Sequence, residues 1–184
     1  MVYVFLADGF EEMEAVAPID ILRRMNIEVT TVGVTGKVVM GSHSIPITAD
    51  ITINEADFSD LSVLLLPGGM PGATNLFANN TLCELIENTA KEGKVIAALC
   101  AAPFIFGKLG LLKGREYTCY PGFEEGIDGI YQKQPLVISE GDYNVITAWG
   151  PGAAYRFGFA LASVLTQDKG AVEALEKSMM MCGD

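Results

Sequence analysis

The stretch Lys94–Pro103, KVIAALCAAP, decides how the rest of this 184-residue chain is interpreted. Residues 95–99 form an unbroken apolar run, which is typical of a strand buried on both faces of a parallel sheet. Pro103 suits the first turn of a helix, because the N–H that proline lacks has no partner there. Cys100 is therefore expected at a sharp turn between a buried strand and a helix. This is the layout of a nucleophile elbow, with sulfur in place of the hydroxyl.

Two interpretations of Cys100 stay open on these residues alone. A free cysteine is often buried and behaves as a small hydrophobic residue. A helix N-terminus, however, supplies partial positive charge and unpaired N–H groups that stabilise a thiolate. The position between strand and helix favours a reactive role, and it predicts a thiol pKa below that of a free cysteine.

Length and composition indicate one domain, residues 1–184. Half of the residues are hydrophobic and the mean hydropathy is +0.33. The apolar runs are nevertheless far shorter than the roughly 20 residues that span a bilayer. The first residues lack the basic region and the cleavage pattern of a signal peptide, so we expect a cytoplasmic protein.

Charge and cysteine spacing disfavour several partners. The 12 basic and 23 acidic residues give a net charge of −11, which disfavours binding to nucleic acid or to an anionic membrane surface. The four cysteines show no metal-binding spacing, and with a single histidine we expect no metal site. In a reducing compartment the cysteines are expected to be free thiols.

Strands and helices alternate along the chain, which predicts a three-layer α/β domain with a mostly parallel sheet and helices on both faces. In such sheets ligands bind beyond the carboxyl ends of the strands. The expected strands are 2–6, 28–32, 38–40, 45–47, 63–66, 95–99, 117–120, 136–138 and 144–148. The expected helices are 11–25, 81–92, a helix from the elbow to 109, 153–165 and 170–182.

Glu14 has an unusual position in the first expected helix. It shares a helical face with the apolar residues Ala17 and Ile21, so the spacing would turn its carboxylate toward the core. An acid in the first turn also complements the helix dipole, as Glu11 and Glu12 do. Periodicity alone leaves both interpretations open.

Two further segments are candidates with simpler explanations beside them. Gly68 and Gly69 follow a core strand, and their backbone N–H groups could hold an oxyanion, although an ordinary strand-exit turn also explains the pair. His43, the only histidine, lies at the tip of the 38–47 excursion. A solvated loop residue is the simpler interpretation of His43 than a catalytic base.

Four segments taken together resemble the signature blocks of the ThiJ/PfpI family. That family includes the Parkinson-disease protein deglycase and is more distantly related to the class I glutamine amidotransferases. The resemblance covers nearly the whole chain in the same order, and it implies a flavodoxin-like sandwich, a homodimer and no organic cofactor. The segments are ADGFEEMEA (7–15), LPGGMPG (66–72), AALCAAP (97–103) and WGPGAA (149–154).

The resemblance assigns roles to residues of this chain. Cys100 corresponds to the family's elbow nucleophile, and Glu14 to a protonated carboxyl that hydrogen-bonds the thiolate. The N–H groups of Gly69 and Ala101 correspond to its oxyanion donors, and Gly68 lies at the same pocket.

One position departs from the family pattern. Many relatives have a histidine where this chain has Tyr120, and a tyrosine with a pKa near ~10 cannot act as a base at neutral pH. A Cys–His pair of the peptidase type is therefore disfavoured. His43 would have to reach the pocket from a loop or from another subunit. The resemblance also brings Arg24 toward the pocket across a dimer interface.

Three functions fit this pattern to different degrees. The first is a cofactor-independent enzyme, similar to a glyoxalase or deglycase, that acts on small reactive dicarbonyls such as methylglyoxal. The second is a non-enzymatic redox or stress sensor in which Cys100 is oxidised to a sulfinate. The third, an amidase or cysteine peptidase, lacks an evident base.

Overall fold

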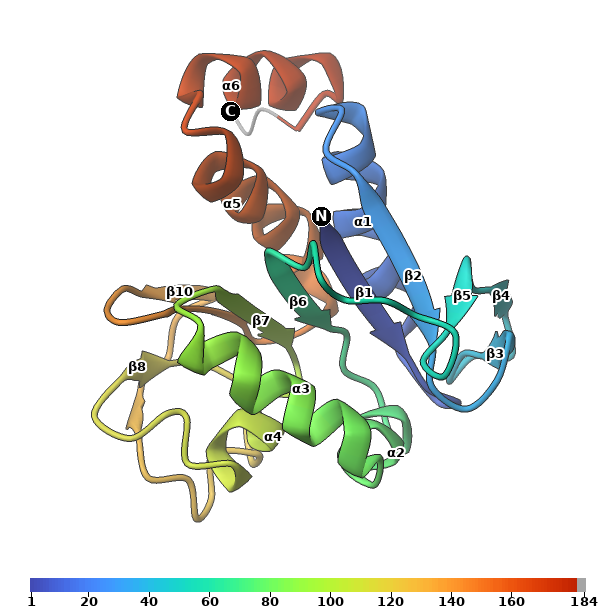
Figure 1. Ribbon diagram of the computed structural model, residues 1–184. Helices are drawn as coiled ribbons and strands as arrows, with labels where there is room; N and C mark the ends of the chain where they lie inside the picture. Colours follow the sequence, from blue (N-terminus) through green and yellow to red (C-terminus); the bar gives the residue numbers. More distant parts are fainter. Residues whose placement is uncertain (182–184) are drawn as a thin grey trace.

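A seven-stranded central sheet organises the structure, a computed structural model that describes residues 1–181. All neighbouring strands are parallel except the pair at one edge of the sheet, residues 136–139 and 144–148, which is antiparallel. With helices on both faces (Figure 1), this arrangement confirms the expected flavodoxin-like α/β fold. The strands, in the order in which they lie side by side, are β10 (Leu136–Ser139), β11 (Asn144–Ala148), β7 (Val95–Leu99), β6 (Val63–Leu66), β1 (Val2–Leu6), β2 (Val29–Gly33) and β5 (Ile51–Thr52).

The helices cover the two faces of this sheet as two separate layers (Figure 1). Strand side chains alternate between the layers: Val4 of β1 points to one face and Phe5 to the other. On the face of Val4 lie α1 (Glu12–Arg24), α5 (Ala154–Thr166) and α6 (Lys169–Ser178). On the face of Phe5 lie α2 (Gly72–Phe77), α3 (Asn80–Lys91) and α4 (Pro103–Lys108).

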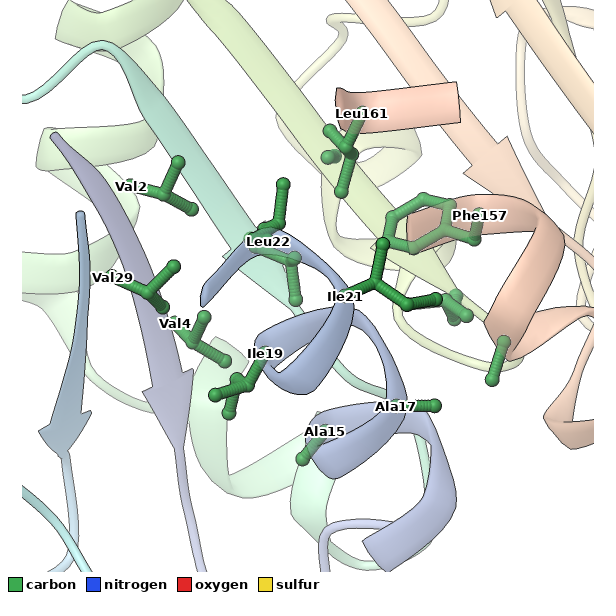
Figure 2. Close-up of a cluster of buried hydrophobic side chains, with 14 of the residues drawn as sticks. Val2, Val4, Ala15, Ala17, Ile19, Ile21, Leu22, Val29, Phe157 and Leu161 are labelled. Carbon is green, nitrogen blue, oxygen red and sulfur yellow. The ribbon is translucent and has the colours of Figure 1, made fainter. Parts of the chain in front are cut away.

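Close packing of α1 against α5 determines which side chains of α1 face the sheet. Figure 2 shows Ile21 of α1 beside Phe157 of α5 within the buried cluster that also contains Val2 and Val4. Gly158 makes this approach possible, because a Cβ at that position would lie 2.7 Å from Cδ1 of Ile21. The rotation of α1 is therefore fixed by tightly fitted contacts.

Two small strand pairs lie outside the main sheet. The early excursion forms the expected antiparallel pair, β3 (Val38–Met40) with β4 (Pro46–Thr48). The expected strand 117–120 is wrong in extent: β8 (Glu116–Tyr117) ends early and pairs with β9 (Ile130–Tyr131), which was not expected. The chain leaves the ladder because the Thr118 N–H donates to the Thr147 hydroxyl oxygen, at 2.9 Å.

Other boundaries differ by small amounts from the sequence expectation. The helix after Cys100 begins only at Pro103, so it does not start beside the thiol. The short helix α2 and strand β5 were not expected, because neither is long enough to show a period. The last helix ends at Ser178 rather than continuing through Met181, and Cys182 lies outside the described residues.

No helix in residues 1–181 has both the length and the apolar character needed to cross a membrane.

Candidate active site

Cys100 lies directly after β7, at the carboxyl edge of the sheet. Its φ of 57° is in the left-handed region, which is uncommon for a residue other than glycine. Backbone hydrogen bonds hold it on both sides: its N–H donates to the Ala148 carbonyl at 2.8 Å, and its carbonyl accepts from the Tyr120 N–H at 2.9 Å. A strained residue between a strand and a helix, fixed by its neighbours, is the geometry of a nucleophile elbow.

Glu14 projects from α1 toward this elbow and is completely buried. Its Oε2 accepts a hydrogen bond from the Gly68 N–H at 2.8 Å, and the carboxyl interacts with the Cys100 thiol. Oε1 is buried and meets no hydrogen-bond partner of good geometry in the described part of the chain. Of the two interpretations of Glu14, the structure therefore selects the inward one.

Gly68 is what allows these two side chains to come together. A Cβ at this position would lie 2.6 Å from the Cβ of Cys100 and 2.7 Å from Oε2 of Glu14. Cβ atoms in proteins essentially never come this close to other heavy atoms. Any residue larger than glycine would therefore displace the Cys100 thiol or the Glu14 carboxyl.

Burial sets the electrostatics of the pair. It raises the pKa of Glu14 to about 7, against the opposing effects of the Gly68 N–H and the Cys100 thiol. Burial, followed by the negative charge of Glu14, also raises the pKa of Cys100 to about 12. The expected fall in the thiol pKa is therefore wrong, because α4 is short and starts beyond the turn while desolvation and a neighbouring carboxylate act directly on the sulfur.

The pair is best described as two groups that share one proton. Two adjacent buried anions are unfavourable, so Glu14 and Cys100 together keep a proton through neutral pH. Cys100 becomes a thiolate when this proton resides on Glu14. The backbone N–H groups of Gly69 and Ala101 both interact with the sulfur and favour the charged form.

Tyr120 and Trp149 border an open hollow beside the elbow. The hollow has a volume of about 360 Å³ and is lined by Tyr120, Pro121, Trp149, Gly150, Pro151 and Gly152. Sequence reasoning named Tyr120 but missed Trp149. The available signal was the position of Trp149 directly after β11, whose last residue Ala148 pairs with Leu99, the residue before Cys100.

Arg24 is not part of this site within one chain. It lies in the last turn of α1, ten residues after Glu14, which corresponds to about 15 Å along the helix. Its guanidinium is half exposed and pairs with Asp20 at 2.8 Å.

His43 is bound to the start of α1 rather than to the elbow. Its backbone N–H donates to Glu12 Oε1 at 2.7 Å, and its Nδ1 lies 2.8 Å from Glu12 Oε2. Burial opposes the ionisation of Glu12, but the hydrogen bonds from His43 outweigh it and lower the Glu12 pKa to about 2. The same hydrogen bond raises the pKa of His43.

Glu11, Glu12 and His43 are also the residues that could contribute ligands to a cation, with one ligand atom from each within 4.8 Å of the others. Their polar atoms have other partners: Glu11 Oε2 accepts from the Glu14 N–H at 2.7 Å, and both Glu12 oxygens accept from His43. The three side chains therefore act as a cap and a tether at the start of α1.

The fold and the site define a class of protein: a flavodoxin-like α/β protein with a cysteine at a strand-to-helix turn and a buried carboxyl beside it. A family model described as the DJ-1/PfpI family matches residues 1–164. The chain belongs to this family.

Relatives and solved structures agree with this assignment. The chain is 35% identical over 165 residues to the Parkinson disease protein 7 homolog of Danio rerio, covering 88% of this chain and 87% of that protein. It is 33% identical over 181 residues to the dj-1beta protein of Drosophila melanogaster, covering 97% and 95%.

Two solved structures share nearly the complete fold. A DJ-1 superfamily protein from Salmonella typhimurium, a cysteine-to-alanine mutant, superimposes with a TM-score of 0.91 at 34% identity, covering 97% of each chain. Toxoplasma gondii DJ-1 in an oxidized form superimposes with a TM-score of 0.90 at 30% identity, also covering 97% of each chain.

Proposed function

We propose that this protein is a cofactor-independent enzyme that converts small reactive dicarbonyls such as methylglyoxal, in the manner of a glyoxalase or deglycase. The single observation that carries the proposal is the buried Glu14 carboxyl, with a pKa of about 7, beside the thiol of Cys100. A group with a pKa near the operating pH both accepts and returns a proton efficiently.

The first step is the addition of Cys100 to the aldehyde. Glu14 takes the thiol proton while Cys100 Sγ forms a bond to the aldehyde carbon. The N–H groups of Gly69 and Ala101, which already face the sulfur, stabilise the oxyanion that develops. The oxyanion then takes this proton from Glu14, which gives a hemithioacetal and returns Glu14 to the carboxylate form.

The second step moves hydrogen between the two carbons of the substrate. The Glu14 carboxylate removes the hydrogen of the former aldehyde carbon as a proton and returns it to the neighbouring carbonyl carbon. The hydroxyl proton passes at the same time from the first substrate oxygen to the second. The product is a lactoyl thioester on Cys100, and its hydrolysis by water releases lactate and the free thiol.

An apolar groove on the outer face of α1 supports a homodimer. Met13, Val16 and Ile45 are each about half exposed, and together with Ile47 and Tyr155 they line this groove. Large exposed apolar side chains that lie together are typical of an interface between protein chains. We infer that a second copy of the chain covers them.

Lactate formation from methylglyoxal tests the enzymatic proposal. We expect Cys100→Ala and Glu14→Gln each to reduce turnover by about a hundredfold or more. Cys83→Ala is the matched control, because Cys83 is a free cysteine on α3, and it should leave turnover unchanged. Lactate production by Cys100→Ala at the wild-type rate would exclude Cys100 as the nucleophile.

A redox sensor is the second candidate function, favoured by the oxidized state of the Toxoplasma relative. In this case two molecules of hydrogen peroxide convert the Cys100 thiol to a sulfinic acid and release two waters. The Glu14→Gln variant separates the two functions. An amide keeps a hydrogen-bond donor near the sulfur but cannot transfer a proton, so an enzyme loses turnover while a sensor still gains two oxygen atoms by mass spectrometry.

A further inference from the structure

We propose that Tyr120 and Trp149 form a binding subsite for a flat apolar group on the substrate, so that the protein prefers aryl-substituted α-oxoaldehydes to methylglyoxal. The proposal rests on the proposed dicarbonyl activity and names the substrate class of that site. Phenylglyoxal, in which a phenyl ring replaces the methyl group of methylglyoxal, represents the preferred class.

The position of the hollow relative to Cys100 is the first argument. The Tyr120 N–H donates to the Cys100 carbonyl at 2.9 Å, so the Tyr120 backbone is joined directly to the elbow. Trp149 follows Ala148, whose carbonyl accepts the Cys100 N–H at 2.8 Å. Backbone hydrogen bonds thus join Tyr120 and the residue before Trp149 directly to Cys100. From this attachment we infer that a substituent of a carbonyl bound to the Cys100 sulfur reaches the hollow.

The chemistry of the lining is the second argument. All six residues around the hollow are aromatic, proline or glycine, and none of them carries a charged side chain. A volume of about 360 Å³ lies within the range of small-molecule sites. A charged substituent would lose water here without gaining a partner, whereas an aromatic ring finds ring faces and edges to pack against.

The rigidity of Tyr120 is the third argument. Its ring packs edge-on against Phe123, with ring centroids 6.4 Å apart and an interplanar angle of 77°. Gly150 lies on another side of the ring, where a Cβ would make an ordinary van der Waals contact of 3.4 Å with Cδ2 of Tyr120. Tyr120 and Trp149 nevertheless remain 48% and 39% exposed, so aromatic surface is available to a ligand.

Relative kinetics for phenylglyoxal and methylglyoxal test the subsite. We expect Trp149→Ala to lower kcat/KM for phenylglyoxal about tenfold, because one aromatic contact is lost, and to change kcat/KM for methylglyoxal less than about twofold. Trp149→Phe should restore most of the preference. Ile138→Ala, at an exposed apolar residue of β10 outside the hollow, should leave the ratio unchanged. If turnover of the two substrates falls equally in Trp149→Ala, the subsite is refuted while the enzymatic function stands.

A binding measurement decides the proposal without any turnover. Trp149 is the only tryptophan of the chain, so the intrinsic tryptophan fluorescence reports directly on this hollow. Mandelate and lactate, the hydroxy acids that phenylglyoxal and methylglyoxal would yield, carry the same charge and differ only in phenyl against methyl. We expect saturable quenching by mandelate, little response to lactate, and an apparent Kd for mandelate about tenfold higher in Tyr120→Ala. Equal responses to the two acids would overturn the subsite, and absence of turnover with either aldehyde would overturn only the proposed activity.

Discussion

Replacing Glu14 by glutamine removes one buried ionisable group while keeping the size of the side chain. In the folded protein burial raises the Glu14 pKa to about 7 from an ordinary value of 4.5. Because the folded pKa is higher than the unfolded pKa, the folded state binds the extra proton. The contribution of Glu14 to stability is therefore complete below pH 4.5 and is lost as the pH rises through about 7.

The magnitude follows from the size of this shift. A rise from 4.5 to about 7 corresponds to roughly 3 kcal/mol of lost stability once Glu14 is ionised in both states. Most of this change, about 2.5 kcal/mol, falls between pH 5 and pH 8. Glutamine does not titrate, so the variant lacks this loss of stability. Between pH 5 and pH 8 the free energy of unfolding of Glu14→Gln should therefore rise by about 2.5 kcal/mol relative to that of wild type.

Urea unfolding of both proteins at pH 5 and pH 8 measures this difference, since the remaining ionisable groups are common to the two proteins. Glu55→Gln is the matched control, because hydrogen bonds from Thr52 lower the pKa of Glu55 below its ordinary value of 4.5 and, within residues 1–181, no group that titrates between pH 5 and pH 8 contacts it. The difference in free energy of unfolding between this control variant and wild type should be the same at both pH values. The free energies of unfolding of Glu14→Gln and wild type should differ by more at pH 8 than at pH 5. If their difference is instead the same at both pH values within about 0.5 kcal/mol, the buried carboxyl does not have a raised pKa, and the acid–base role assigned to it is refuted.

Three further predictions concern assembly, oxidation and packing. Light scattering after size exclusion at micromolar concentration should give the mass of a dimer, and Val16→Asp should give a monomer, because a charge in the apolar groove is costly to bury; a monomeric wild type would refute the interface. Mild peroxide should not join Cys100 to Cys119 in the folded protein, because Cys119 is completely buried in the core on the α4 side; a bridged peptide in the mass spectrum would show that this placement is wrong. Gly68→Ala should lower the free energy of unfolding by about 1–3 kcal/mol and abolish lactate formation, because the added methyl group overlaps Cys100 and Glu14. Full activity in this variant would mean that the Cys100 thiol and the Glu14 carboxyl need not approach each other so closely.

The sequence by itself determined the framework of the fold. The apolar run 95–99 predicted β7 with its observed bounds, and Pro103 predicted the start of a helix soon after Cys100. The run 2–6 likewise predicted β1. Such elements can be derived from the chain because their signals are local: side-chain period, proline geometry and unbroken apolar runs act within a few residues.

The same reasoning did not predict the short elements. The strands β5 and β9 contain two residues each, too few to display a period, and they form only because a neighbouring strand supplies hydrogen bonds. The expected strand 117–120 failed for a related reason. The alternation of its side chains suited a strand, but the Thr118 N–H donates to the side chain of Thr147, which is remote in sequence.

The candidate site depended on tertiary structure in the same way. Periodicity left the direction of Glu14 undecided, and the packing of α1 against α5 turned it toward Cys100. The pKa of Cys100 was expected to fall because of the helix that follows it, yet it rises, because desolvation and the Glu14 carboxylate act across space at short range. Trp149 came to lie beside the elbow only through the pairing of β11 with β7. Local sequence patterns set which backbone each segment forms, whereas burial, charge proximity and pocket lining arise between segments distant in the chain and were decided only when the sheet and its helices assembled.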